Sequence, residues 1–213
     1  MKKSKAILMA LCAVLLVAAS VMGTLAYLTS TDSVTNTFTV GNVKITLDEK
    51  DTDEDTNTDD NVTVNGVIRD KANVYHLLPG HTYTKDPIVR VDANSENCYL
   101  FVKVVNEIAA IEEKGTNEAP ATTTVAAQMA AKGWAAVDPD NGIYVYGTAD
   151  APTAVAGGES VTVFEKFVID DDVNNTTLAN YNNKTITVTA YAVQADGFAG
   201  ETAADIWAAA KFN

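Results

Sequence analysis

The sequence predicts a mainly β protein, an antiparallel jelly-roll-like β-sandwich with a helical insertion and a short C-terminal helix. Apolar residues recur at every second position, or fill runs of four to eight, over most of the chain. Clusters of Gly, Pro, Asn and Asp separate these runs. Only two stretches have helical spacing. About eight to ten short strands joined by turns are typical of a sandwich.

The first 26 residues read as an export signal. Three lysines within the first five residues precede an apolar stretch over residues 6–22. Thr24 and Ala26 then place small residues at positions −3 and −1 of a cleavage site. We therefore expect cleavage between Ala26 and Tyr27 and a mature domain that begins at Tyr27.

Residues 27–40 are a candidate β-arm. Their apolar positions from 34 to 40 are even-numbered, whereas those from 43 to 47 are odd-numbered, and Gly41 and Asn42 lie at the change. Because successive side chains of a strand point to opposite faces, Gly41 and Asn42 must form a turn, a bulge or a hinge. Either a short hairpin turns at these two residues, or a detachable arm pairs with the sheet of another subunit. In the second interpretation the side chains that fill pockets are those of Leu28, Val34, Phe38 and Val40.

The region around this hinge carries a motif, TFTVG at 37–41 followed by VKITL at 43–47. Together with the leader, over about residues 21–48, it resembles the N-terminus of the TasA and camelysin family of exported Gram-positive proteins. The resemblance implies processing by a SipW-type signal peptidase, the same sandwich fold, and assembly into biofilm-matrix fibres. Camelysin itself is described as a metallopeptidase.

Charge and cysteine content narrow the classes of function. The whole chain has a net charge of −13, and loss of the three signal lysines brings the mature chain to −16. Such a charge opposes binding to nucleic acid and to anionic lipid. Cys12 leaves with the signal, so Cys98 has no partner for an intramolecular disulfide. An exported domain of this kind is held together by its core, by metal or by assembly.

Residues 48–60 form an acidic segment that contains no apolar residue. Asp51, Asp53 and Asp55 have the spacing with which a calcium-binding EF-hand loop begins. However, Thr56 stands where that loop needs glycine, and no glutamate occupies its twelfth position. A solvated loop is the favoured interpretation, and calcium is the only cofactor that the sequence suggests.

Four segments organise the rest of the domain, residues 41–213. Residues 98–105 are apolar on both faces and are the candidate central strand. Residues 185–194 alternate most clearly. A helical insertion is expected over about 106–134, because apolar residues from Val125 to Trp134 recur at helical spacing. Residues 202–212 predict a short helix that covers one end of the sandwich. Further strands are expected within 62–68, 83–91, 143–146 and 160–169.

Catalytic motifs are lacking. The two histidines, His76 and His81, flank a Pro-Gly turn and form no H-E-x-x-H zinc motif. Cys98 lies in the expected core strand, where cysteine acts as a small hydrophobe. No nucleophile elbow, phosphate-binding loop or dinucleotide fingerprint occurs. The sequence therefore predicts a protein that is not an enzyme.

The leading hypothesis is a secreted subunit of an extracellular, biofilm-matrix fibre. Donor-strand exchange of the arm 27–40 would join identical copies head to tail, in the matrix or on the surface of a Gram-positive-type bacterium. The membrane is a partner only of the uncleaved signal. The alternative is a monomeric adhesin or carbohydrate-binding module, and a camelysin-like metallopeptidase is third. The rings that the alternative would use are Tyr144, Tyr146, Trp134 and Trp207.

Overall fold

The computed structural model describes residues 2–27, 41–52, 61–115 and 122–212. The chain divides into two compact units, residues 1–40 and 41–213. The first unit contains helix α1 (Lys2–Tyr27), so the predicted leader is helical. Its side chains from Ile7 to Val17 are exposed, most of them apolar. None of the helices in the described part of the chain has the length and hydropathy of a membrane span.

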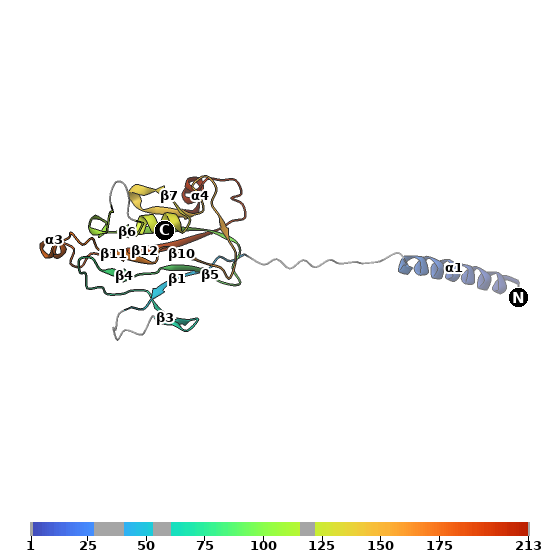
Figure 1. Ribbon diagram of the computed structural model, residues 1–213. Helices are drawn as coiled ribbons and strands as arrows, with labels where there is room; N and C mark the ends of the chain where they lie inside the picture. Colours follow the sequence, from blue (N-terminus) through green and yellow to red (C-terminus); the bar gives the residue numbers. More distant parts are fainter. Residues whose placement is uncertain (1, 28–40, 53–60, 116–121, 213) are drawn as a thin grey trace. The chain divides into compact units, whose positions relative to one another are not determined.

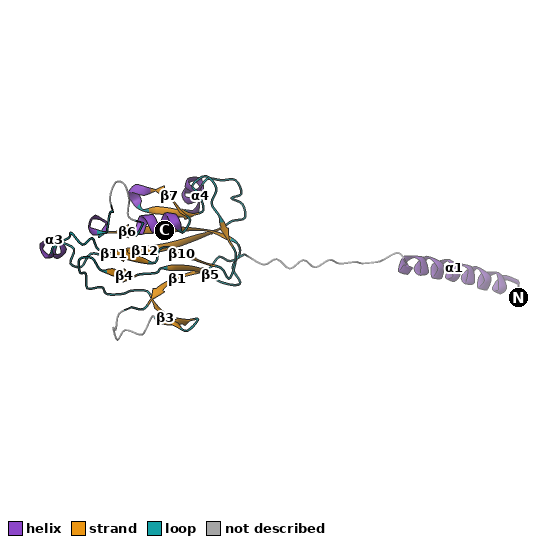
Figure 2. Ribbon diagram, viewed as in Figure 1, coloured by secondary structure: helices purple, strands orange, loops and turns teal. Residues whose placement is uncertain are grey.

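The second unit is mainly β with antiparallel pairing, as predicted, and its helices are few and short (Figures 1 and 2). Its strands are β1 (Ile45–Lys50), β2 (Val62–Val64), β3 (Val67–Asp70), β4 (Thr82–Thr84), β5 (Ile88–Val91), β6 (Cys98–Asn106), β7 (Trp134–Asp138), β8 (Ile143–Tyr146), β9 (Ala154–Val155), β10 (Ser160–Thr162), β11 (Lys166–Val168) and β12 (Ile186–Gln194). Its helices are η1 (Ala109–Ile111), α2 (Val125–Ala131), η2 (Pro139–Asn141), α3 (Asn175–Ala179) and α4 (Ala203–Ala210).

The strands form two larger sheets and one small one. The first sheet has the order β10-β5-β1-β3-β2, and the second has the order β12-β6-β8-β7, with β9 also paired to β6. The small sheet joins β11 to β4. Strand β1 pairs with β5 through Ile45–Asp48 but with β3 only through Glu49 and Lys50. The hairpin of β2 and β3 is therefore joined to the rest of the first sheet by strand pairing only at the end of β1.

Strand β6 is buried on both faces, which confirms the prediction of a central core strand. Leu100 and Val102 point between the two large sheets, where they meet Val89 and Val91 of β5. Phe101 points to the other face and packs against α4. The C-terminal helix was expected to cover one end of the sandwich. It covers the outer face of the second sheet instead, because the apolar outward residues of β6 and β8 need a cover there.

The helical insertion is shorter than the spacing predicted. Strand β6 continues to Asn106, and α2 occupies only Val125–Ala131. The side chain of Thr124 caps this helix by accepting the N–H of Ala127, as the sequence indicated. Gly133 follows the helix with φ at 88°, a conformation that only glycine adopts readily. Trp134 then begins β7, so it is not part of the helical stripe.

Two predicted strand segments are interrupted. Pro87 separates β4 from β5 because its nitrogen cannot donate a ladder hydrogen bond. The stretch 160–169 likewise divides into β10 and β11. In contrast, the expected strand segment 62–68 forms the hairpin of β2 and β3, which turns at Asn65 and Gly66, since both residues have the positive φ of a type I′ turn.

The two faces of β6 give a matched test of the core. Val102 is fully buried, whereas Val105 in the same strand is 44% exposed. We expect Val102→Ala to lower the free energy of unfolding by roughly 2–3 kcal/mol, since it removes buried methyl groups and leaves a cavity. Val105→Ala should cost less than about 1 kcal/mol. Chemical denaturation of the two variants measures the difference, and equal losses would contradict the assigned burial.

Candidate functional site: a groove beside the free edge of β12

Strand β12 has one paired edge and one free edge. It pairs with β6 over its whole length, from Ile186 opposite Asn106 to Gln194 opposite Cys98. No strand among the described residues pairs with its other edge. The N–H of Glu107 donates to Thr185, and the N–H of Ala195 donates to Asn97. Odd-numbered residues therefore bond to β6, and even-numbered ones direct their N–H and C=O groups to the free edge.

Strand β1 also has a short free edge, close to β12. The N–H of Asp92 donates to Lys44, so the even-numbered residues of β1 bond toward β5. The backbone groups of Ile45 and Leu47 consequently point away from β5, while β3 begins to pair only at Glu49. Cα atoms of β1 and β12 come within 8 Å of each other, yet no ladder joins the two strands.

A groove of about 1270 Å³ opens between these elements. It is larger than most pockets that hold a small molecule, which have roughly 300–1000 Å³. One side consists of α3, the loop after it and β12 up to Ala190, and the other consists of the end of β1 and the chain from Asp70 to Leu78. Its apolar lining residues are Leu47, Val74, Tyr75, Leu77, Leu78, Ile108, Phe167, Leu178, Ile186, Val188 and Ala190.

The apolar side chains of β12 that line the groove are incompletely covered. Val188 and Ala190 face the core but are only half-buried. Their cross-strand neighbours on β6, Val104 and Val102, are 9% and 0% exposed. On the opposite wall Leu78 is 41% exposed. The inner face of β12 is therefore covered less than that of β6, next to an edge that has no partner strand.

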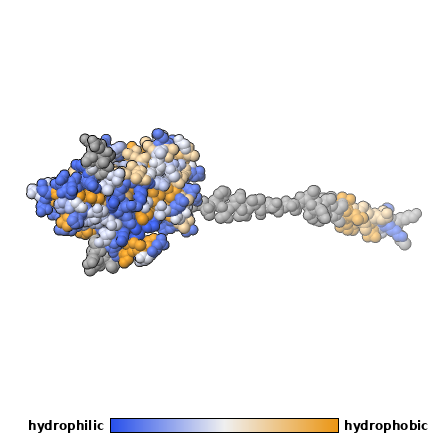
Figure 3. Space-filling view, in the orientation of Figure 1, coloured by the Kyte–Doolittle hydropathy of each residue, from blue (hydrophilic) through white to orange (hydrophobic). Residues whose placement is uncertain are grey.

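A second apolar patch lies on the hairpin of β2 and β3. Val62, Val67 and Ile68 are 56%, 39% and 51% exposed, and apolar atoms gather over β3 in Figure 3. This patch is not part of the groove lining.

An ion-pair cluster fixes the end of β1 beside the groove. The Arg69 guanidinium is 5% exposed and bonds to the carboxylates of Asp48 and Asp86. Arg90 also pairs with Asp48, at 3.1 Å. Burial lowers the pKa of Arg69, but the hydrogen bonds and charges of Asp48 and Asp86 raise it by more, so the net shift is upward. The guanidinium joins β3 to β1 and to the chain before β5.

A second pair fixes the wall of the groove. The Glu49 carboxylate is 5% exposed and lies 2.6 Å from the Lys85 ammonium. Asn73 donates to that carboxylate at 2.9 Å and to the carbonyl of Lys50 at 3.0 Å. These bonds hold the chain after β3 against β1. They stabilise the groove wall without occupying the free edge of β12.

Tyr83 holds the next part of the same wall. Its hydroxyl donates to the carbonyl of His76 at 2.6 Å and accepts the N–H of Leu78 at 2.7 Å. Burial raises the pKa of Tyr83, so the hydroxyl stays protonated and can donate. Among the described residues, the hydrogen-bond partner of the His81 ring is the carbonyl of Pro79. His76 and His81 thus belong to the turn, as the sequence favoured.

The start of β12 is fixed to the end of β6. The Glu107 carboxylate accepts a hydrogen bond from the Lys184 ammonium at 2.9 Å and another from the N–H of Thr185 at 2.9 Å. The hydrogen bond from Lys184, followed by those from Thr185, lowers the pKa of Glu107 to about 2. The start of β12, which lines the groove, is therefore held in place by Glu107.

The predicted hinge is partly anchored. The carbonyl of Asn42 accepts the N–H of Glu96 at 3.0 Å, which ties the chain before β1 to the loop between β5 and β6. Non-glycine residues with positive φ in the described part of the chain are Asn65, Asn183 and Lys211, so Asn42 does not have the left-handed backbone of a type I′ turn. Gly41 is the first described residue of the domain, so the alternative of a hairpin that turns at Gly41 and Asn42 stays a prediction.

The other predicted arm residues cannot be placed. Tyr27 ends α1 next to Ala26, and the side chains of both lie outside what the structure describes. The expected cleavage site therefore stays a prediction. The arm residues Leu28, Val34, Phe38 and Val40 also lie outside the described ranges.

Of the calcium candidates, only Asp51 is described, and Asp53 and Asp55 lie outside those ranges. The Asp51 carboxylate accepts the side-chain amide of Asn61 at 3.4 Å. One further oxygen of each of these two side chains is buried with no hydrogen-bond partner among the described residues. Calcium binding by this segment stays a prediction.

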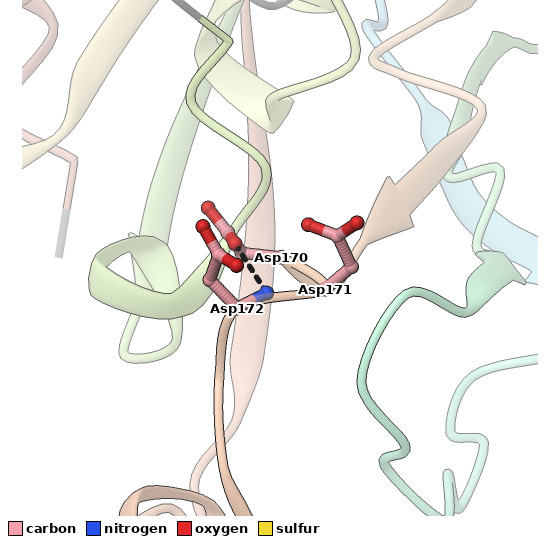
Figure 4. A group of neighbouring side chains, drawn as sticks. All are labelled: Asp170, Asp171 and Asp172. Carbon is pink, nitrogen blue, oxygen red and sulfur yellow. Dashed lines mark hydrogen bonds between the residues drawn. The ribbon is translucent and has the colours of Figure 1, made fainter.

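Three neighbouring aspartates form a second acidic group. Carboxylate oxygens of Asp170, Asp171 and Asp172 lie within 4.8 Å of one another. As Figure 4 shows, Asp170 and Asp172 lie together while Asp171 points away. Asp170 accepts the N–H of Asp172 at 2.9 Å, the hydrogen bond of an Asx turn. A capped acidic turn accounts for this cluster.

Residues suggested for other functions lie mainly in the core. Cys98 is fully buried, and burial raises the pKa of its thiol to about 11, which opposes the thiolate that a nucleophile needs. Trp134 is 3% exposed and its indole donates to the carbonyl of Thr162. Trp207 makes an edge-on contact with Tyr191 and a tilted contact with Phe101. These rings pack against the sheets and do not form an exposed platform.

Comparison with known protein families, with curated proteins and with solved structures found no match. The sequence spacing indicated the apolar face of β12 but not the groove. The groove depends on the chain at 71–78, which has no regular structure and whose apolar residues have no clear period.

The ion-pair cluster gives a test of how the groove wall is held. Arg69→Ala leaves Asp48 and Asp86 without their shared cation, so we expect a loss of roughly 3 kcal/mol in the free energy of unfolding. Lys44→Ala removes an exposed pair with Asp92, at 3.7 Å, and should change stability by less than about 1 kcal/mol. Denaturant titration of both variants measures this. Similar losses in the two would show that Arg69 is not the buried anchor.

The burial of Cys98 gives a second test. In the chain that begins at Tyr27 it is the only cysteine. We expect the native thiol to resist an aromatic disulfide reagent at pH 8, because it is buried and protonated, and to react within minutes once the protein is unfolded in guanidinium chloride. Absorbance of the released thiolate follows the reaction. Rapid labelling of the native protein would contradict the core position.

Proposed function

We propose that this protein is an exported structural subunit that polymerises head to tail through its N-terminal arm, residues 27–40. The arm of one copy occupies the groove beside β12 of the next. The single observation that carries this proposal is the free edge of β12 next to half-covered apolar side chains. A strand that added there would pair the free backbone groups and cover Val188 and Ala190 together.

The arm has the properties of a suitable occupant. Its sequence, YLTSTDSVTNTFTV, carries one charged side chain and is rich in Thr, Val and aromatic residues, which favour strands. Fourteen residues in extended form reach about 46 Å, longer than the nine residues of β12, which reach about 30 Å. The arm therefore spans the groove with residues to spare for the connection.

The leader accounts for the timing of assembly. Helix α1 exposes apolar side chains such as Leu8, Val14 and Leu16, each more than 60% exposed, which a secreted domain would not retain. Cleavage between Ala26 and Tyr27, by a peptidase of the SipW type, frees the start of the arm. Export to the matrix or cell surface of a Gram-positive-type bacterium, membership of the TasA and camelysin family and a jelly-roll arrangement of the sheets are parts of the same proposal.

The competing functions have less support. A carbohydrate-binding module needs exposed rings, whereas Trp134 is in the core and Tyr144 and Tyr146 pack against it. A metallopeptidase needs ligands and a general base, but His76 and His81 belong to a turn. We therefore propose a non-enzymatic, structural role and rank the adhesin second and the peptidase third.

Deletion of the arm tests the proposal. The chain from Tyr27 to Asn213 should form filaments visible by electron microscopy, and its sedimentation should increase with time. A chain that begins at Gly41 should stay monomeric and folded, because β1 pairs with β5 from Ile45 onward without any residue of the arm.

The matched control replaces residues 27–40 by fourteen Gly and Ser residues, which keeps the length of the arm but removes its strand-forming side chains. This control should not polymerise. Filaments from the chain that begins at Gly41, or from the Gly/Ser control, would exclude the arm as the joining element.

A further inference from the structure

The two ends of the domain have different roles. The loop 92–97 joins β5 to β6, and it lies beside the start of β1, because Glu96 donates to Asn42. The last residue of β12, Gln194, is opposite Cys98 at the same loop. We call this the loop end of the domain. The chain enters the folded unit here, at Gly41.

The groove opens at the opposite end. Its lining includes the start of β12, the end of β1 and α3, which lies at one extremity of the domain in Figure 1. Residues of the loop 92–97 do not line it, and neither do the last four residues of β12, 191–194. We call this the groove end. An arm that leaves at the loop end of one copy meets the groove end of the next when the copies stack head to tail.

This polarity determines the direction of the arm. Its C-terminal residue, Val40, must enter the neighbour at the groove end, and Tyr27 must then lie toward the neighbour's loop end. Strand β12 runs from the groove end, at Ile186, to the loop end, at Gln194. The arm and β12 therefore run in opposite directions. The arm and β1 run in the same direction, since β1 starts at the loop end.

We propose that the neighbour's arm adds antiparallel to the free edge of β12, giving a sheet of the order arm-β12-β6-β8-β7, and does not pair with β1. This inference rests on the proposed function. Every other pair in these sheets is antiparallel, so the added strand continues the existing pattern. The free edge of β1 offers only Ile45 and Leu47 before β3 begins to pair at Glu49.

The alternation of side chains agrees with this edge. The residues of β12 that direct backbone groups outward, including Val188 and Ala190, also direct their side chains to the core. An arm residue that faces one of them in the ladder points its side chain to the same side. The apolar arm residues nearest the domain, Phe38 and Val40, thus enter the groove. If Val40 faces Ile186, at the groove end, then Phe38 faces Val188 and Thr37 faces Thr189.

The odd-numbered pairs provide a probe that leaves the core intact. Thr187 and Thr189 of β12 are exposed. With the arm added, Thr37 and Thr189 form a directly opposed, non-hydrogen-bonded pair, whose Cα atoms lie about 4.5 Å apart. That spacing is close enough for a disulfide between cysteines. Cys98 does not interfere because it is fully buried.

The experiment mixes two mature chains that begin at Tyr27, one carrying Thr37→Cys and the other Thr189→Cys, and oxidises the assembled filaments. The expected product is a covalent dimer that contains one of each chain, seen on a non-reducing gel and lost on reduction. The matched control pairs Thr37→Cys with Thr46→Cys, an exposed position on β1, and should give at least tenfold less dimer. Thermal unfolding of each variant checks that it is folded.

The outcomes separate the edge from the function. Two results would overturn the assignment to β12 and leave the fibre proposal standing. One is a dimer between Thr37→Cys and Thr46→Cys. The other is filaments that give no dimer with Thr189→Cys or with Thr46→Cys, even when Thr39→Cys replaces Thr37→Cys in the arm. Failure of the unsubstituted mature chain to form any filament would overturn the fibre proposal and this inference together.

Discussion

The unpaired edge of β12 is the constraint on which the rest of this structure depends. Backbone N–H and C=O groups are costly when they lose water without gaining a partner, and an exposed strand edge is a template for pairing with another chain. Here that edge borders a groove with apolar side chains on both walls. A strand added at this edge would pair those backbone groups and cover those side chains together.

The surrounding elements make this edge a rigid acceptor. Strand β12 pairs with β6 along nine residues, and β6 is buried on its other face by α4. Across the groove, the Arg69 cluster and the pair of Glu49 and Lys85 hold the end of β1 and the chain after β3. A groove whose walls are already ordered loses little conformational entropy on binding, so most of the cost falls on the arm.

Much of the fold followed from local pattern. The central position of β6, the alternation in β12, the turn at Asn65 and Gly66 and the cap of the C-terminal helix by Thr202 are all visible in the sequence. Strand ends were less predictable, because Pro87 and the residues before Lys166 break apolar runs that read as continuous. The face covered by α4 could not be predicted either, since two apolar faces of β6 give no indication of which one a helix covers.

By itself, the sequence determined the mainly β class, the apolar stretch near the N-terminus and the lack of a known catalytic motif, because each of these is a property of neighbouring residues. Only the tertiary structure decided that β12 lies at an edge and that the groove opens at the end opposite Gly41. Edge position depends on which segments pair across long separations, such as Ile186 with Asn106, and no local periodicity records that choice.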